Sequence, residues 1–311
     1  MDKFGIIGNP VKGSRSPELF AAAYEDKRQA DGSEYKYDLI EEADFESAWA
    51  KFRDEYKAVN VTAPFKELAF LRMVELLKGG KGKISGPVAK IGATNLLVNT
   101  PEGVEAYNSD FTGIILSVAE AWYPGIVAEF MNTFGSGFHV KVHQFFSRNL
   151  KAKCPEQPQA LIVGCGGAGR AAAVAAAELG FATVLMNRSV EKAQAIATSM
   201  PEYGFIVDPI SDFKEAVKEC ELVIYTLPMA LPEITGFSAD DFATETGTPH
   251  VILEANYKNP SFDEEARFKM ASADRTYVSG LNWLLYQAIS GYSMMTGLEP
   301  DAQAMAKVRW Q

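Results

Sequence analysis

The feature that most restricts the fold of this chain is a glycine-rich turn between two apolar segments. Residues 160–180 read ALIVGCGGAGRAAAVAAAELG, and Gly164, Gly166 and Gly169 match the spacing G-x-G-x-x-G, with Gly167 and Ala168 inside it. The run before the turn is typical of a buried strand, and the alanines after it favour a helix. Glycines at this spacing let the backbone approach a pyrophosphate, which the N–H groups of the helix N-terminus bind. The segment predicts a dinucleotide site on a Rossmann-type unit, and the alternative is a plain strand-to-helix turn.

The residues that bind the adenosine ribose are expected about 20 positions further on, at the end of the next strand. There the chain reads Asn187-Arg188-Ser189, followed by Lys192. An Asp or Glu at this place accepts a hydrogen bond from a free ribose hydroxyl, whereas Arg188 and Lys192 can pair with a ribose phosphate. We therefore expect NADP rather than NAD, unless the two cations only begin a solvated helix.

Short β-like runs alternate with helical patterns along the chain, which is typical of an α/β fold with mostly parallel sheets. Before the glycine turn we expect strands at 4–8, 35–40 and 58–61, helices at 45–56 and 111–122, and a hairpin around 101–103. Ser16 and Asp44 are expected to cap helices, and Pro64 to open a helix through residue 77. GGKGK at 79–83 indicates a loop. After the turn we expect strands at 182–188, 205–207, 222–225 and 251–254, and a helix at 189–200.

The length of the chain favours two domains, because 311 residues exceed what one core usually supports. Residues 281–295 form a mostly apolar helical pattern that we expect to pack back on the first domain. The first domain then comprises 1–110 with 280–311, and the second comprises 111–279.

Residues 122–158 form an aromatic-rich segment that interrupts the α/β pattern. Its aromatic residues are Trp122, Tyr123, Phe130, Phe134, Phe138, Phe145 and Phe146. A solvated linker is poor in aromatic residues, so this segment is expected to pack on the chain or on another subunit. His139 and His143 have helical spacing for a metal site, but FHVKVHQFF also alternates like a strand and no third ligand is evident. We therefore predict no metal.

The charge and the cysteines restrict the partners and the compartment. A formal net charge of −10 argues against nucleic acid and anionic membranes, because both attract a basic surface. The three cysteines, Cys154, Cys165 and Cys220, show no C-x-x-C spacing, which favours free thiols in a reducing compartment. With neither a signal-peptide pattern nor an 18-residue apolar run, we expect a cytoplasmic protein that acts on a small molecule, as a monomer or homodimer.

The chain resembles the shikimate dehydrogenase family in seven motifs that follow one another in order and span nearly all of it. They are GNPVKGSRSP (8–17), NVTAPFKE (60–67), IGATN (91–95), YNSDFTG (107–113), GCGGAGRA (164–171), NRS (187–189) and GLNWLLYQA (280–288). The resemblance implies an N-terminal α/β substrate domain, completed by the last helices, and a Rossmann-type doubly wound NADP-binding domain. The implied activity is the reversible, NADPH-dependent reduction of 3-dehydroshikimate to shikimate.

The resemblance also assigns roles to individual residues. Lys66 and Asp110 would form the catalytic pair, and Ser14 and Ser16 would hold the substrate carboxylate. The residues that would contact substrate hydroxyls are Thr62, Asn95, Tyr257 and Gln287. Gly280 would join the cofactor-binding residues of the glycine turn and of the segment 187–192.

The chemistry of a ketone reduction explains why a lysine and an aspartate would be needed. Hydride addition at carbon leaves an alkoxide at oxygen, so a proton donor must lie beside that oxygen. A lysine ammonium can donate the proton, and a carboxylate can keep the lysine charged and aimed.

Each candidate residue also has a purely structural alternative. Lys66 is alternatively an exposed helix residue, and Asp110 an N-cap of the helix that starts at Phe111. Ser14 and Ser16 are alternatively cap and loop residues, and Gln287 can face solvent.

Several positions depart from the family pattern and leave the substrate open. The departures are Gly13, Leu96, Ala106, Glu254 and Trp283. One alternative is a relative acting on quinate or another hydroxy-carboxylate. Another is a non-catalytic NADPH-binding protein that uses the aromatic-rich segment as an interface.

Overall fold

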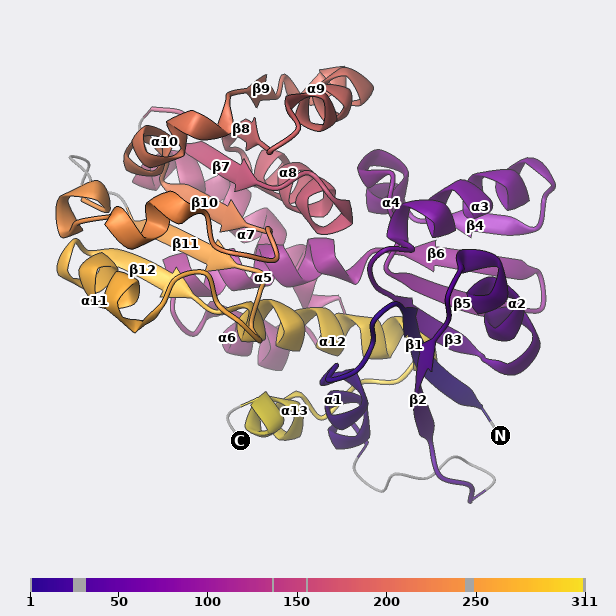
Figure 1. Ribbon diagram of the computed structural model, residues 1–311. Coiled ribbons are helices and arrows are strands. Elements are labelled where there is room, and N and C mark those ends of the chain that lie inside the picture. The colour runs from indigo at the N-terminus through magenta and orange to yellow at the C-terminus, as the bar shows by residue number, and fades with distance from the viewer. Residues whose placement is uncertain (1, 25–31, 136, 155, 244–248, 310–311) are drawn as a thin grey trace. The chain divides into compact units, whose positions relative to one another are not determined.

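The computed structural model describes residues 2–24, 32–135, 137–154, 156–243 and 249–309 (Figure 1). The chain divides into two compact units, Met1–Gly113 with Leu285–Gln311 and Ile114–Leu284. Both are α/β, and we describe each by itself. The predicted α/β fold class is therefore confirmed, while the division of substrate and cofactor between the two units stays a prediction.

The first unit contains a six-stranded mixed sheet. Its order is β2 (Lys36–Glu41), β1 (Lys3–Gly8), β3 (Ala58–Val61), β5 (Leu96–Thr100), β6 (Gly103–Tyr107) and β4 (Gly82–Ile84). β1 is parallel to β2 and β3, whereas β5 runs antiparallel to β3 and β6. The hairpin predicted around 101–103 is confirmed as β5–β6. The loop predicted at 79–83 is wrong at its end, because Gly82 and Lys83 pair with β6 as part of β4.

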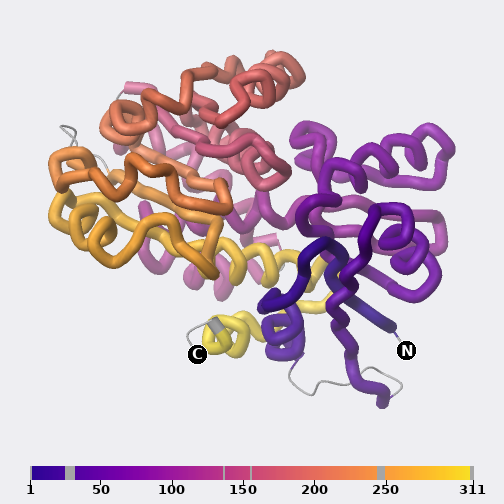
Figure 2. Tube along the Cα trace, in the orientation of Figure 1, coloured from indigo at the N-terminus to yellow at the C-terminus, as the bar shows by residue number. Residues whose placement is uncertain are grey.

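Helices cover both faces of this sheet. The helices of the unit are α1 (Ser16–Ala22), α2 (Phe45–Glu55), α3 (Lys66–Lys78), α4 (Gly86–Ile91), the end of α12 (Gly280–Thr296) and α13 (Ala302–Arg309). α2, α3 and α4 share one core with the sheet, to which α2 contributes Phe45, Ala48, Trp49 and Phe52 at helical spacing. On α1, the ring of Phe20 packs on Phe4 of β1 and on Tyr292 of α12. Figure 2 shows that α13, near the C-terminus, lies beside α1, near the N-terminus.

The helix starts of this unit test three sequence predictions. Asp44 caps α2 as expected, since its carboxylate accepts from the backbone N–H of Ser47 at 2.9 Å. Ser16 is not a cap, because the N-cap of α1 is Arg15 and Ser16 is already helical. Pro64 does not open α3, which begins two residues later at Lys66, because Pro64 lies in a turn closed by a bond from Phe65 N–H to the Thr62 carbonyl.

The second unit contains a six-stranded sheet whose described pairs are all parallel. Its order is β12 (Arg275–Val278), β11 (His250–Glu254), β10 (Leu222–Tyr225), β7 (Gln159–Val163), β8 (Ala182–Met186) and β9 (Ile206–Val207). This order is that of a doubly wound dinucleotide-binding sheet, with the glycine turn after its first strand. The accompanying helices are α8 (Gly167–Leu179), α9 (Val190–Ser199), α10 (Phe213–Glu219) and α11 (Glu264–Ser272). β12 has no counterpart among the strands that we predict from sequence.

The aromatic-rich segment forms two helices after α5 (Ser109–Trp122), namely α6 (Ile126–Phe134) and α7 (Phe138–Lys153). The strand alternative for FHVKVHQFF is therefore wrong. The segment packs on its own unit, where the ring of Phe146 lies 5.4 Å from Trp122 and 6.2 Å from Phe181. His139 and His143 share α7, but within the described ranges no group of three His, Cys, Asp or Glu side chains is placed to hold a metal.

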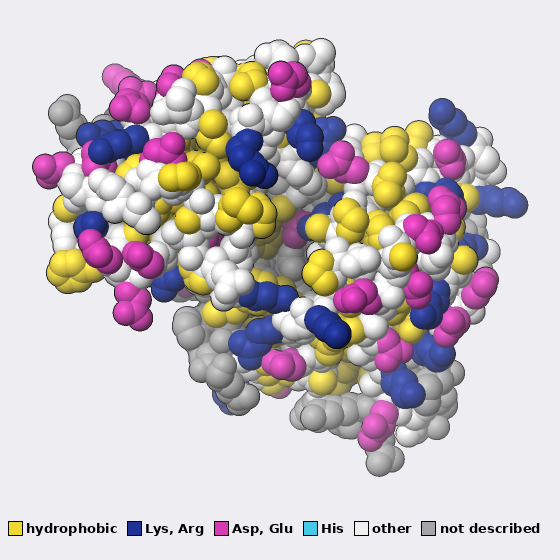
Figure 3. All heavy atoms as spheres, in the orientation of Figure 1, with side chains coloured by type: hydrophobic (Ala, Val, Ile, Leu, Met, Phe, Trp, Pro, Cys, Tyr) yellow, Lys and Arg dark blue, Asp and Glu magenta, His cyan; other side chains and the backbone are white. Residues whose placement is uncertain are grey.

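The visible surface carries charges of both signs, and the described helices are too short or too polar to cross a membrane singly. Figure 3 shows acidic and basic side chains interspersed on the visible face of each unit. Over the described residues no single helix is long and apolar enough to cross a membrane, and α5 and α6 reach that length only as a pair bent by 119°.

Two phenylalanines of the aromatic-rich segment, one on α6 and one on α7, are expected to differ in their contribution to stability. Phe146 is 0% exposed, so Phe146→Ala should lower the free energy of unfolding by about 3–5 kcal/mol through loss of burial and the cavity it leaves. Phe134 is 46% exposed, so the matched variant Phe134→Ala should change it by no more than about 0.5 kcal/mol. Urea denaturation followed by far-UV circular dichroism measures both, and equal losses would contradict this packing.

Candidate active site

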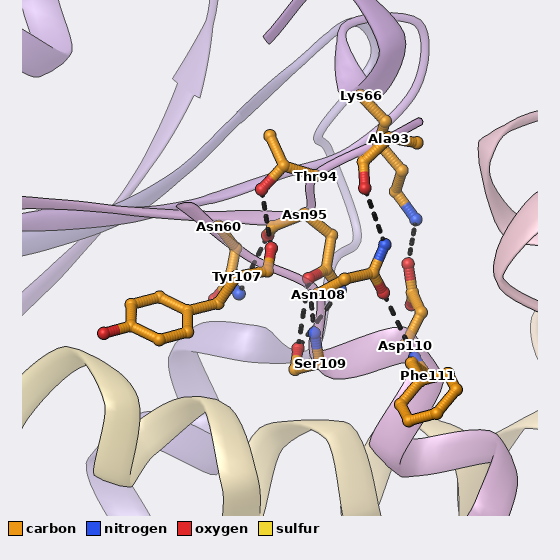
Figure 4. A network of polar contacts seen from close by, with 10 residues as sticks. All are labelled: Asn60, Lys66, Ala93, Thr94, Asn95, Tyr107, Asn108, Ser109, Asp110 and Phe111. Atoms are coloured by element: carbon orange, nitrogen blue, oxygen red, sulfur yellow. Dashed lines mark hydrogen bonds and ion pairs between the residues drawn. The ribbon is translucent and has the colours of Figure 1, made fainter. Parts of the chain in front are cut away.

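Lys66 and Asp110 form an ion pair in the first unit. Lys66 is the first residue of α3 and Asp110 the second of α5, and Lys66 Nζ lies 2.5 Å from Asp110 Oδ2 (Figure 4). Their side chains are 16% and 6% exposed. Since removing one partner of a buried pair leaves an uncompensated charge, each side chain holds the other in place. Lys66 is therefore not the solvent-exposed lysine of the structural alternative.

Asn108 performs the capping role that was the structural alternative for Asp110. Its Oδ1 accepts from the backbone N–H of Phe111 at 3.1 Å, and its Nδ2 donates to the Ala93 carbonyl at 2.9 Å. α5 consequently begins at Ser109, one residue before Asp110. Because the cap is supplied by Asn108, the Asp110 carboxylate is available to Lys66.

The segment before β5 fixes the neighbouring polar side chains. The backbone N–H of Thr94 donates to the Lys66 carbonyl at 3.0 Å, which ties this segment to the start of α3. Asn95 is buried and is held through both ends of its amide, since Oδ1 accepts from Ser109 N–H at 2.7 Å and Nδ2 donates to Ser109 Oγ at 3.1 Å (Figure 4). Asn95 and Asp110 therefore occupy fixed positions relative to each other.

A cavity of about 70 Å³ lies in the first unit beside this ion pair. The predicted substrate or catalytic residues that line it are Ser16, Thr62, Lys66, Asn95, Asp110 and Gln287. Ser14 does not line the cavity, but its Oγ donates to Ser16 Oγ at 3.1 Å. The structure thus brings six of the eight predicted residues together at one cavity, and Ser14 is hydrogen-bonded to one of the six.

Gln287 lines this cavity with an unsatisfied acceptor. Its Oε1 is buried and has no hydrogen-bond partner within the described part of the chain. A buried acceptor without a donor costs about 1–3 kcal/mol, so a ligand that offers a hydroxyl there would be favoured. The solvent-facing alternative for Gln287 is therefore wrong.

A pair of hydrogen-bonded residues that line the cavity, Tyr37 and Asn60, was missed by the sequence analysis. Tyr37 donates from its hydroxyl to Asn60 Oδ1 at 2.6 Å, and both side chains face the cavity. Asn60 begins the motif NVTAPFKE, which was the signal available for it. Tyr37 lies on β2 in a run with no other polar motif, and only the pairing of β2 beside β1 brings it to the site.

Tyr257 belongs to the second unit, in the loop that follows β11. Glu254 braces this loop from the end of the strand: its buried carboxylate accepts from the backbone N–H of Ser261 and, at 2.8 Å, from the hydroxyl of Tyr277. Glu254, a departure from the family pattern, is therefore accommodated by its own hydrogen bonds.

The glycine turn between β7 and α8 has the shape that close approach of a phosphate requires. Gly164 has φ +105°, which disfavours other residues, and a Cβ on Gly169 would overlap the carbonyl oxygen of Gly164. Gly166 is exposed and nothing lies within 4 Å of the Cβ that it lacks. These observations fit a dinucleotide pyrophosphate at the start of α8.

The residues after β8 differ in what they can offer a ribose phosphate. The amide of Asn187 is hydrogen-bonded within the protein. Its Oδ1 accepts from Cys165 N–H at 3.2 Å, and its Nδ2 donates to the Ser189 carbonyl at 2.8 Å. Ser189 donates to Glu191 at 2.7 Å. Arg188 and Lys192 are exposed, so their cationic groups can meet an anionic ligand.

In the predicted cofactor region, Cys165 has a buried thiol and Gly280 lies close to the backbone of another segment. Burial raises the pKa of the Cys165 thiol to about 11, so this thiol stays protonated and is a poor nucleophile at neutral pH. Gly280 begins α12, and a Cβ there would overlap the carbonyl oxygen of Ala255. This close approach explains the glycine without any ligand.

The fold and the site define a two-unit α/β protein with a Rossmann-type unit and a buried lysine–aspartate pair beside a polar cavity. Two family models match this chain: the shikimate dehydrogenase substrate binding domain over residues 6–97, and shikimate / quinate 5-dehydrogenase over residues 148–251. The shikimate dehydrogenase (NADP(+)) of Halobacterium salinarum strain R1 is 27% identical over 311 residues, covering 98% of this chain and 97% of the relative.

Solved structures agree with these matches. The crystal structure of Mycobacterium tuberculosis shikimate dehydrogenase has a TM-score of 0.71 and 25% identity, covering 100% of this chain and 99% of that chain. The Thermus thermophilus shikimate 5-dehydrogenase in complex with NADP(H) and shikimate shares the fold, with a TM-score of 0.67, 24% identity and coverage of 100% and 99%. The chain belongs to the shikimate dehydrogenase family, as its seven motifs predict.

The glycine turn yields a prediction that separates packing from ligand approach. Gly169→Ala should destabilise the second unit by about 1–3 kcal/mol or more, because backbone atoms leave no room for a methyl group. Gly166→Ala should leave stability within about 0.5 kcal/mol, since the added methyl group meets open space. Thermal unfolding compares the two variants, and a Gly166→Ala loss as large as that of Gly169→Ala would contradict the geometry of the turn.

Proposed function

We propose that this protein catalyses the reversible, NADP-dependent reduction of 3-dehydroshikimate to shikimate. The observation that carries the proposal is the Lys66–Asp110 ion pair at a polar cavity whose other walls present Ser16, Thr62 and Asn95. Family membership supports the same reaction, since the Halobacterium salinarum relative is a shikimate dehydrogenase that uses NADP.

Lys66 is proposed to move the proton in this reaction. In the reductive direction its ammonium donates a proton to the oxygen that becomes the C–OH group, and in the oxidative direction its neutral amine accepts that proton. Asp110 keeps the Lys66 side chain oriented through the 2.5 Å contact. The low exposure of both side chains excludes water and strengthens their interaction with a developing alkoxide.

The other predicted site residues are proposed to position the substrate. Ser14 and Ser16 form a hydroxyl pair suited to a carboxylate. The residues proposed to meet substrate hydroxyls are Thr62, Asn95 and Gln287, which line the cavity. For Tyr257 the same role rests on the family resemblance alone. Gln287 Oε1 is the clearest of them, because it needs a donor that the described residues do not supply.

The second unit is proposed to hold the cofactor, which supplies the hydride when bound. Gly164, Gly166, Gly167, Ala168 and Gly169 would surround the pyrophosphate, and Arg188 and Lys192 would pair with the ribose phosphate. Asn187 and Ser189 would shape this region through their hydrogen bonds rather than through charge. Gly280 would permit the start of α12 to approach the loop after β11.

We further propose that the enzyme acts in the cytoplasm, as a monomer or homodimer, without nucleic acid or a membrane as partner. The net charge of −10 supports the exclusion of polyanionic partners. The three cysteines are free and buried, which suits a reducing compartment. Quinate is the second candidate substrate, because the family description that matches residues 148–251 names both acids.

Replacing Lys66 provides the test of the proposed chemistry. Lys66→Met should lower kcat for NADPH oxidation with 3-dehydroshikimate by about 10²–10⁴-fold, because general acid catalysis contributes that much. The matched control is Lys78→Met at the exposed end of the same helix, which should keep kcat within about twofold. Circular dichroism verifies folding of both variants. Equal kcat values for wild type and Lys66→Met would overturn the proposal.

A further inference from the structure

Arg15, which lies between the two serines of the proposed carboxylate subsite, reaches to the C-terminal helix. Its Nη2 donates to the carbonyl oxygen of Val308, 293 residues away, at 2.7 Å. The same guanidinium donates to Glu18 Oε2 from Nε at 3.2 Å and from Nη2 at 3.0 Å. Nε and Nη2 are thus directed at protein acceptors.

The serine loop, residues 11–16, is held by local hydrogen bonds and by contacts with segments that are distant in sequence. Within the loop, Ser14 N–H donates to the Val11 carbonyl at 3.1 Å and Ser16 N–H donates to Ser14 Oγ at 3.3 Å. On the preceding side, Val11 N–H donates to Glu41 Oε2 at the end of β2 at 2.9 Å. On the following side, Arg15 makes a long-range contact with Val308.

The acceptor on α13 is a carbonyl that the helix itself leaves unpaired. α13 spans Ala302–Arg309, so Val308 is in the last turn, where carbonyl groups have no partner within the helix. A cation at this end also interacts favourably with the helix dipole. Arg15 therefore both satisfies a terminal carbonyl of α13 and holds the last turn of this helix against the serine loop.

α13 also forms part of the cavity wall. Met305 is 0% exposed and lines the cavity, together with Ser16 from the serine loop. The start of α13 is attached to the end of α1 by a bond from Asp301 N–H to the Ala23 carbonyl at 3.0 Å. The position of α13 and the position of the serine pair are consequently set by the same contacts.

We propose that Arg15 is a positioning residue that couples the substrate carboxylate subsite to the docking of α13. This inference rests on the proposed function, because it takes Ser14 and Ser16 to hold the carboxylate of shikimate. By linkage, if docking of α13 orders the serine pair for binding, then bound shikimate must stabilise α13 to the same extent. Shikimate binding and protection of residues 302–309 should therefore change together.

The first measurement uses the wild-type chain alone. Hydrogen–deuterium exchange is followed by mass spectrometry in peptides that cover 302–309, with and without saturating shikimate. Shikimate should slow exchange in these peptides several-fold. Unchanged exchange at saturating shikimate would overturn the coupling, whatever the variants do.

The second measurement removes the contact. Arg15→Met should raise KM for shikimate by about tenfold, the effect of losing one charge-assisted hydrogen bond, and leave kcat within about twofold. It should also accelerate exchange in 302–309 and abolish the effect of shikimate there. Arg15→Lys, which keeps a donor for the Val308 carbonyl, should recover part of the KM. Lys12→Met is the matched control: it removes an exposed cation from the same loop and should change neither KM nor exchange beyond about twofold.

The outcomes separate this inference from the proposed function. A raised KM without faster exchange in 302–309 would mean that Arg15 acts on the substrate directly, and it would overturn the coupling. Faster exchange with an unchanged KM would overturn it as well. If wild type neither binds nor turns over shikimate, the proposed function fails, and the exchange comparison between wild type and Arg15→Met still shows whether Arg15 holds α13.

Discussion

The ion pair between Lys66 and Asp110 is the interaction on which the site in the first unit depends. A buried charge is tolerated only when it is paired, so the fold must place both side chains at the same point. The turn after β3 positions Lys66, and the turn after β6 positions Asp110. Because β3 and β6 flank β5 in the sheet, the two turns approach from either side of one strand.

Two asparagines secure this arrangement without taking part in the pair. Asn108 caps α5, which frees the Asp110 carboxylate from the capping role that its position suggested. Asn95 is bonded to both the N–H and the hydroxyl of Ser109, so the start of β5 and the start of α5 keep a fixed spacing. A polar side chain that is hydrogen-bonded through both its amide oxygen and its amide nitrogen is held in one orientation, which is what a preorganised site requires.

The sequence predicted those parts of the fold that local physics dictates. The glycine turn predicted β7 and α8, because few residues other than glycine tolerate φ +105° at Gly164 or the close approach at Gly169. The hairpin and the cap at Asp44 were also predictable, because turn residues and capping side chains are local signals. Lys66 and Asp110 were singled out by family resemblance rather than by pattern, since each alone is compatible with an ordinary surface or capping role.

The features that sequence reasoning missed depend on contacts between distant segments. β4 is a strand only because β6 offers it an edge, so a glycine-rich run was interpreted as a loop. The starts of α1 and α3 were misplaced by one or two residues because proline permits several turn positions near a helix start. Tyr37 lacks a local signature of function, and Asn60 has only the motif NVTAPFKE as its signal. Their 2.6 Å hydrogen bond exists only because sheet pairing brings β2 and β3 to either side of β1. Arg15 meets Val308 only when both ends of the chain join one unit.

The most direct test of the central claim is a comparison of initial rates for the wild-type enzyme with shikimate and with quinate, each with NADP⁺ and with NAD⁺. We predict the highest kcat/KM for shikimate with NADP⁺, because the proposed roles of the exposed Arg188 and Lys192 and of the Lys66–Asp110 pair require a ribose phosphate and a ring hydroxyl. No turnover of either acid with either cofactor would contradict the assignment of an enzymatic function. A higher kcat/KM for quinate with NAD⁺ would contradict the assigned substrate and cofactor.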